Sequence, residues 1–206
     1  IGIGFSASAQ DPQFTQFYSN PIYLNPAFAG SHDCPRIAMN YRNEWPSLTG
    51  NYVTYSASYD QYFKNISGGF GVIAMHDQQG QGTIFTSMLG AVYSYHLNVS
   101  RKFKMMFGAR AAMFNKYLDW SKLTFGDMID PRRGFIYQTG DVQRGGSRYF
   151  FDASAGMVGY NKHFFFGFAA HHLNRPDESM IIGSSRLPIR MTGHMGAKIP
   201  LGSKSQ

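Results

Sequence analysis

Hydrophobic and polar residues alternate along most of the chain beyond its first 35 residues, and this period of two predicts β-strands with two different faces. In RIAMNYRNEW, residues 36–45, Ile37 and Met39 alternate with Arg36 and Asn40. The same pattern predicts about eight strands, near 36–45, 51–62, 69–76, 84–97, 102–114, 148–160, 164–173 and 188–199. The chain is therefore expected to be all-β.

The lengths of the predicted strands and of their connections indicate a barrel. Strands 84–97 and 102–114 are about thirteen residues long, whereas about five or six is usual in globular sheets. Every second connection, such as NVSR or NKH, is tight, and every other one, such as DQQGQGT, is longer. Transmembrane barrels have short periplasmic turns and larger outer loops. We therefore expect residues 36–206 to form an antiparallel, up-and-down transmembrane β-barrel.

Residues 101–114, RKFKMMFGARAAMF, show how the two faces of one strand are assigned. The period of two places one set of side chains against lipid, namely Phe103, Met105, Phe107, Ala109 and Met113. It places the other set in the interior, namely Lys102, Lys104, Gly108 and Arg110. An arginine on the lipid face should reduce insertion, whereas a polar exchange on the inner face should cost far less. The candidates for partner binding on the inner face are Arg36, Arg42, Lys104 and Arg110.

The opening stretch DPQFTQFYSNPIYLNPAFAG, residues 11–30, combines prolines with aromatic residues. Each proline follows an aspartate or asparagine and breaks regular structure. We expect residues 10–35 to pack at the periplasmic end of the barrel through Phe14, Phe17, Tyr18, Tyr23 and Phe28. Residues 1–9, IGIGFSASA, end in an A-x-A pattern and are interpreted as the remnant of a signal peptide.

Composition supports an exported β protein. Charged residues make up 15% of the chain and aromatic residues 16%, and there are 23 glycines, which favours strands joined by tight turns. No apolar run approaches the roughly 20 residues that a membrane helix needs. Cys34 is the only cysteine, so no internal disulfide can form. The net charge of +7 with interleaved aromatics is also compatible with a single-strand nucleic-acid binder, but the export signal argues against nucleic acid as a partner.

No recognisable catalytic, metal or cofactor site is present in the sequence. The pair His171-His172 is interpreted as structural, because adjacent residues on a strand point to opposite faces. There is no G-x-S-x-G and no H-E-x-x-H, so we do not expect an enzyme. The long segment 115–147 holds four aspartates without EF-hand spacing and is interpreted as a folded surface loop. Its basic side could meet lipopolysaccharide or an acidic partner through Arg132, Arg133, Arg144 and Arg148.

Two stretches of the sequence resemble a known family. DPQFTQFYSNPIYLNPAFAG, behind a signal peptide, resembles the opening of the PorP/SprF family of outer-membrane components of the type IX secretion system. YFFDASAGMVGYNKHFFFGFAAHHLNRP, residues 149–176, is similar to that family in its FDxSxG strand, tight turn and following G-x-x-x-H-H-L strand. The resemblance runs from about residue 10 to the end. Family members are larger, so the barrel is expected to be incomplete, without its closing strands.

The resemblance implies an outer-membrane location and a binding role rather than an enzymatic one. Relatives help to secrete or anchor particular surface proteins, including gliding adhesins, whose C-terminal domains carry the export signal. The implied partners are such a cargo domain, other type IX secretion components and outer-membrane lipid, without a cofactor. The alternative is a general outer-membrane pore for small solutes, which ion conductance in planar bilayers would distinguish.

Overall fold

The computed structural model describes residues 12, 14, 16–32, 34–47, 50–80, 82–130, 132–140, 146–180 and 184–198. The expected signal-peptide remnant, residues 1–9, lies outside the described residues. Within the described part of the chain, no helix is both long enough and apolar enough to cross a membrane.

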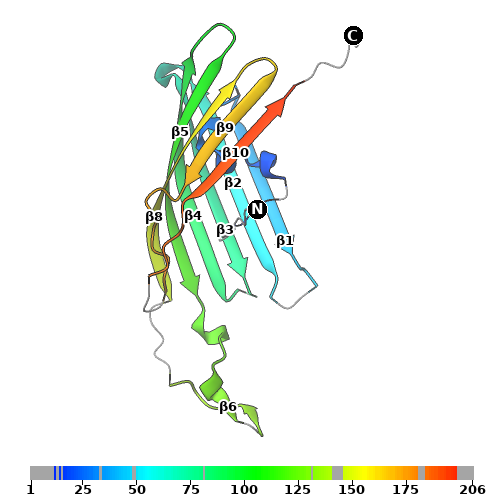
Figure 1. The fold of residues 1–206 in the computed structure, drawn as a ribbon. Helices are drawn as coiled ribbons and strands as arrows, with labels where there is room; N and C mark the ends of the chain where they lie inside the picture. Colours follow the sequence, from blue (N-terminus) through cyan, green and yellow to red (C-terminus); the bar gives the residue numbers. More distant parts are fainter. Residues whose placement is uncertain are drawn as a thin grey trace, which may run out of the picture.

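Eight strands form one antiparallel sheet in the order β1-β2-β3-β4-β5-β8-β9-β10 (Figure 1). Their bounds are β1 Arg36–Glu44, β2 Tyr52–Phe63, β3 Gly68–Gln79, β4 Ile84–Asn98, β5 Lys104–Leu118, β8 Ser147–Tyr160, β9 Phe164–His171 and β10 Arg190–Ala197. Each strand pairs with its neighbours in the chain order of these eight, and the sheet curves into an open half-barrel. The predicted all-β, antiparallel, up-and-down architecture is confirmed.

The connections gather at two ends of the sheet, as expected. The turn end holds the connections β2–β3, β4–β5 and β8–β9, the first of which contains the 3₁₀ helix η3, Lys64–Ile66. The loop end holds the others (Figure 1). The prediction of a longer connection between β3 and β4 was wrong, because both strands are longer than expected and only residues 80–83 join them. Gly80 and Gly82 adopt positive φ there, which a tight turn requires and glycine permits.

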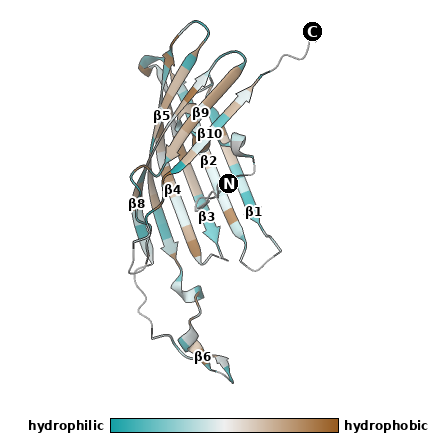
Figure 2. Cartoon of the chain, viewed as in Figure 1, coloured by the Kyte–Doolittle hydropathy of each residue, from teal (hydrophilic) through white to brown (hydrophobic). Residues whose placement is uncertain are grey.

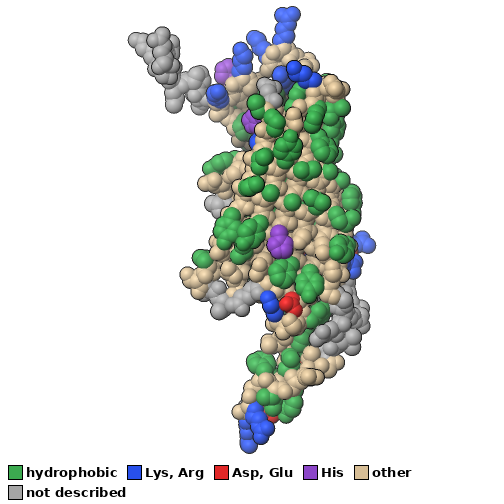
Figure 3. Space-filling model, turned by 180° about the vertical axis from the view of Figure 1, so that it is seen from behind, with side chains coloured by type: hydrophobic (Ala, Val, Ile, Leu, Met, Phe, Trp, Pro, Cys, Tyr) green, Lys and Arg blue, Asp and Glu red, His purple; other side chains and the backbone are tan. Residues whose placement is uncertain are grey.

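The alternation of side chains divides the sheet into an inner and an outer face. On β5, Phe107, Ala109 and Met113 are exposed on the outer face, whereas Gly108 and Arg110 are buried on the inner one. This face assignment is as predicted. Hydrophobic residues dominate strands such as β9 (Figure 2). From behind, the sheet carries hydrophobic side chains across its middle, and lysines and arginines gather toward the two ends (Figure 3). An outer face of this kind is suited to a hydrocarbon environment.

Two further parts of the chain complete the fold. The first is the connection between β5 and β8, which carries η4 Trp120–Lys122, η5 Gly126–Met128 and the two-stranded β6 Ile129–Asp130 and β7 Gly134–Phe135. The second is the N-terminal segment, here residues 12–30, with η1 Phe17–Ser19, α1 Pro21–Leu24 and η2 Pro26–Phe28. Ile22 of this segment packs with inward side chains of three strands in the main core cluster: Ile73, Met75, Met88, Val92, Ala112 and Phe114.

Candidate functional site on the inner face of the sheet

The N-terminal segment lies directly against the backbone of the inner face, and glycines make this approach possible. A Cβ atom on Gly108 would lie 2.3 Å from the backbone nitrogen of Ala27 and 2.3 Å from the carbonyl carbon of Pro26. A Cβ atom on Gly156 would lie 2.1 Å from Oδ1 of Asn25. Neither position has room for any side chain, so the sequence of the strands is adapted to hold this segment.

The two asparagines that precede prolines in this segment anchor it by their side chains. Nδ2 of Asn20 donates a hydrogen bond of 2.8 Å to Oγ of Ser56 on β2. Nδ2 of Asn25 donates to the carbonyl oxygens of Met157 and Phe168, each at 3.1 Å, while its Oδ1 accepts from the backbone N–H of Ala27. Both asparagines are fully buried. Their hydrogen bonds tie the segment to strands on both sides of the half-barrel.

Carbonyl groups of the segment are satisfied by polar side chains that point inward from the strands. The acceptors are Leu24, Ala27, Phe28 and Ala29, and the donors are, in the same order, His171, Ser94, Arg36 and His96. A buried backbone carbonyl without a partner costs about 1 to 3 kcal/mol. These inward polar residues therefore act as a cradle for the segment.

An ion pair closes this cradle at the turn end. Nε of Arg36 lies 2.9 Å from Oδ1 of Asp60, which is the residue opposite it on β2. Oδ2 of Asp60 also accepts a 2.8 Å hydrogen bond from the backbone N–H of Gly30. The pair thus connects the first strand of the sheet to the end of the N-terminal segment.

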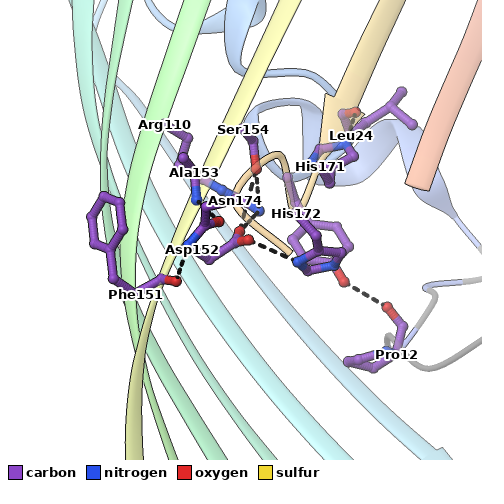
Figure 4. Close-up of polar contacts among 11 residues, drawn as sticks. Pro12, Leu24, Arg110, Phe151, Asp152, Ala153, Ser154, His171, His172 and Asn174 are labelled. Atoms are coloured by element: carbon purple, nitrogen blue, oxygen red, sulfur yellow. Dashed lines mark hydrogen bonds and ion pairs between the residues drawn. The ribbon is translucent and has the colours of Figure 1, made fainter. Parts of the chain in front are cut away.

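A second polar cluster is buried deeper, where β5, β8 and the end of β9 meet (Figure 4). Asp152 is 0% exposed and receives Nη2 of Arg110 at 3.2 Å on one oxygen and Nδ1 of His172 at 2.8 Å on the other. Arg110, which is 4% exposed, also donates to Oγ of Ser154 at 2.9 Å. Because one carboxylate holds partners from two other elements, we interpret the cluster as a structural lock between strands.

Contrary to what strand alternation would predict, the two adjacent histidines do not point to opposite faces of the sheet. His171 ends β9 and faces inward to Leu24, whereas His172 follows the strand with a left-handed φ of 58°. The strand alternation has ended at that point, so both side chains are buried, and the expectation of opposite faces was wrong. Within the described residues, no three His, Cys, Asp or Glu side chains are grouped closely enough to hold a metal ion.

The five aromatic residues predicted to dock the segment lie in different environments. Phe14 and Tyr23 are partly buried and meet edge to face, with ring centroids 5.8 Å apart. Phe28 is also partly buried and packs against the core cluster of Ala27, Met106 and Val158. Tyr18 is 67% exposed. The side chain of Phe17 lies outside the described part of the structure.

Of the four basic residues predicted on the inner face, only Arg36 and Arg42 share one groove. Each of these two has an acidic neighbour, Asp60 and Glu44 respectively. Arg110 is enclosed in the cluster with Asp152. Lys104 is exposed at the first residue of β5, close to the turn end.

This groove, with a volume of about 1430 Å³, opens beside the N-terminal segment. It lies between the N-terminal segment, β1, β10 and the turn from β8 to β9. Aromatic rings form much of its wall, including Phe14, Tyr18, Tyr23, Phe28, Tyr160 and Phe165. Five lysines or arginines line it and, among the described residues, no aspartate or glutamate does: Arg36, Arg42, Lys162, Arg190 and Lys198.

Adding a methyl group at Gly108 is expected to displace the N-terminal segment. Gly108→Ala forces the backbone at Ala27 to move, at a cost of about 1 to 3 kcal/mol. The variant should still insert and fold. An added protease should, however, cleave its N-terminal segment more readily than that of the parent protein. Gly193→Ala is the matched control, because its Cβ atom would meet only ordinary contacts of 3.5 Å or more. Equal protection of the two variants would contradict the docking described above.

Sequence reasoning missed most of these anchoring residues, although a signal was present. The aspartate, serine and glycine of the FDxSxG strand are Asp152, Ser154 and Gly156. Their spacing of two places all three on one face, and in the structure that face is the inner one. In the sequence, Asn20 and Asn25 are distinguished only by the prolines that follow them. A period of two among polar residues on an otherwise apolar strand is the signal that identifies such inner-face groups.

Comparison with known protein families gives a match. The family model described as "Type IX secretion system membrane protein PorP/SprF" matches residues 6–204. No curated protein and no solved structure matches the chain. The family match includes the N-terminal segment, its cradle and all eight strands of the sheet. The chain therefore belongs to the PorP/SprF family of type IX secretion system membrane proteins.

Proposed function

We propose that this protein is an outer-membrane component of type IX secretion that binds the C-terminal domain of a secreted cargo protein and anchors it at the cell surface. The observation that carries the proposal is the groove beside the N-terminal segment, whose wall is aromatic and carries basic but not acidic side chains among the described residues. A cargo surface that presents carboxylates and apolar groups would complement it.

The charges available to a partner differ from those expected from the sequence. Arg36 forms an ion pair with Asp60, and Arg42 forms one with Glu44. Lys162 and Lys198 lie at the turn end of the groove, and the backbone N–H of Lys198 donates a 2.7 Å hydrogen bond to the carbonyl of His163 beside Lys162. We therefore assign the principal contact with cargo carboxylates to these two lysines.

Placement in the outer membrane is supported by the outer face of the sheet. Large apolar side chains such as Met39, Leu89, Phe168 and Met191 are exposed there. A soluble protein rarely exposes so many apolar side chains on one surface. Strands of eight to fifteen residues are also suited to the roughly 9 to 11 residues that a tilted strand needs to cross a bilayer.

A pore for small solutes is the alternative, and the N-terminal segment argues against it. Buried residues of this segment, such as Ile22, Asn25 and Ala27, occupy the inner face where solutes would have to pass. Purified protein in planar bilayers should therefore show little ion conductance. Sustained conductance with the N-terminal segment intact would favour the pore.

Reversing the two groove lysines should release the cargo. Lys162→Glu with Lys198→Glu replaces attraction for carboxylates with repulsion, so the surface protein should appear in the culture medium rather than on cells. Lys64→Glu with Lys102→Glu is the matched control, because these lysines are also at the turn end but do not line the groove. Both double variants should keep the heat-modifiable folded band on a gel. Full retention of the surface protein by the groove variant would refute the assignment.

A further inference from the structure

The connection between β5 and β8 forms a separate lobe that extends beyond the loop end of the sheet (Figure 1). It begins after β5 at Asp119, and its far end is the two-stranded hairpin of β6 and β7. The hairpin points away from the strands rather than along the outer face of the sheet (Figure 1). It therefore lies outside the layer that the apolar outer face would occupy.

Internal hydrogen bonds order this lobe, and its carboxylates are used in them. Asp130 accepts from the backbone N–H groups of Arg132 and Arg133 and from the hydroxyl of Tyr137. Asp127 accepts from the backbone N–H of Gly140 and from Thr139. The hydrogen bond from the Arg132 N–H lowers the pKa of Asp130, and the one from the Gly140 N–H lowers the pKa of Asp127. This contribution to local order is present at neutral pH and is lost only as the pH falls through the lowered pKa values.

The outside of the hairpin carries apolar and cationic side chains that nothing described covers. Phe135 is 61% exposed, and Ile129, Ile136 and Tyr137 are each about half exposed. Arg132 and Arg133 are exposed beside them, and no carboxylate of the described residues forms an ion pair with either guanidinium. We call these six residues the tip surface. Ile129 and Phe135 are opposite each other in the hairpin, so their exposed side chains adjoin. An exposed apolar patch rimmed by polar residues marks an interaction site.

We propose that the tip surface is a docking site for a protein whose matching surface has an apolar centre and an acidic rim. The composition fits, because aromatic residues and arginine are enriched where protein interfaces gain most of their affinity. A protein is favoured over lipid because the hairpin projects away from the outer face of the sheet. This surface is separate from the groove and acts whether or not the groove holds cargo.

Site-specific photocrosslinking in living cells tests the proposal. The photoreactive residue p-benzoylphenylalanine replaces Tyr137 in the full protein, and the adduct is identified by mass spectrometry. We expect one discrete protein adduct, whose yield falls about tenfold when Arg132→Glu and Arg133→Glu are added, because two attractive charges become repulsive. The neutral pair Arg132→Gln and Arg133→Gln should cause a smaller loss. The photoreactive residue removes the Tyr137 hydroxyl in every variant alike, and the backbone N–H groups that bind Asp130 are unchanged, so the variants should share one hairpin conformation.

Three controls accompany this experiment. The same photoreactive residue at Tyr149, an exposed position on β8, should not yield the same protein adduct. Lys64→Glu with Lys102→Glu should leave the Tyr137 adduct unchanged, and so should the groove variant Lys162→Glu with Lys198→Glu. Adducts with lipid or lipopolysaccharide alone, the absence of any adduct, or a protein adduct insensitive to the arginine reversal would each overturn the proposal. If the surface protein is lost from cells while the Tyr137 adduct persists, the result bears on the proposed function of the groove and not on the tip surface.

Discussion

Asp152→Ala is expected to destabilise the folded protein by about 3 to 5 kcal/mol, which is the usual cost of removing one partner from a buried ion pair. The substitution leaves the buried guanidinium of Arg110 without its counter-charge and removes the acceptor for His172. The heat-modifiable folded band should therefore be lost at a markedly lower temperature or urea concentration. Asp127→Ala, in the exposed lobe, should leave the unfolding of the sheet unchanged.

A double variant separates charge from packing in this cluster. Arg110→Met with Asp152→Leu removes both charges and fills much of the same space, so most of the lost stability should return. If the single and double variants unfold at the same point, the contribution of Asp152 lies in its packing and in His172 rather than in the ion pair. If Asp152→Ala unfolds like the parent protein, the cluster does not lock the strands at all.

Phe107→Arg is expected to prevent most of the protein from inserting. Phe107 is 41% exposed on the outer face of β5, and an arginine facing lipid near the midplane costs roughly 2 to 4 kcal/mol. That is a large share of a typical folding free energy of about 5 to 15 kcal/mol. The measurement is the fraction of protein that forms the heat-modifiable band in the outer-membrane fraction.

Lys104→Gln on the same strand is the control for Phe107→Arg and should fold normally. Lys104 is exposed at the strand end and takes part in no ion pair among the described residues. Normal insertion of Phe107→Arg would mean that the outer face of this sheet does not contact lipid. Poor insertion of both variants would indicate a general sensitivity of β5 instead.

The inner face of β5 shows where prediction from the sequence stopped. The period of two places both Lys104 and Arg110 on that face. The sequence therefore predicts that replacing either one by a polar residue costs little stability. The structure separates them, because Arg110 is enclosed by Asp152 and Ser154 while Lys104 is exposed. Arg110→Gln should therefore resemble Asp152→Ala in its cost rather than Lys104→Gln.

Local sequence patterns are enough to predict the eight strands of the main sheet, their two faces and the family. Strand alternation is a local property with a period of two, so it can be read along a single segment such as residues 104–114. The family resemblance depends on two contiguous stretches and is also independent of how the chain folds back on itself. The match over residues 6–204 confirms it.

Which side chains meet across the inner face depends on how the chain folds back on itself. Asp60 accepts a hydrogen bond from Gly30, which is 30 residues away in the sequence. Asn25 donates one to Phe168, which is 143 residues away. No local pattern encodes such pairs, because they depend on the curvature of the sheet and on the path of the N-terminal segment across it. The same long-range geometry decided which basic residues are paired internally and which line the groove, since charge in a sequence carries no information about its partner.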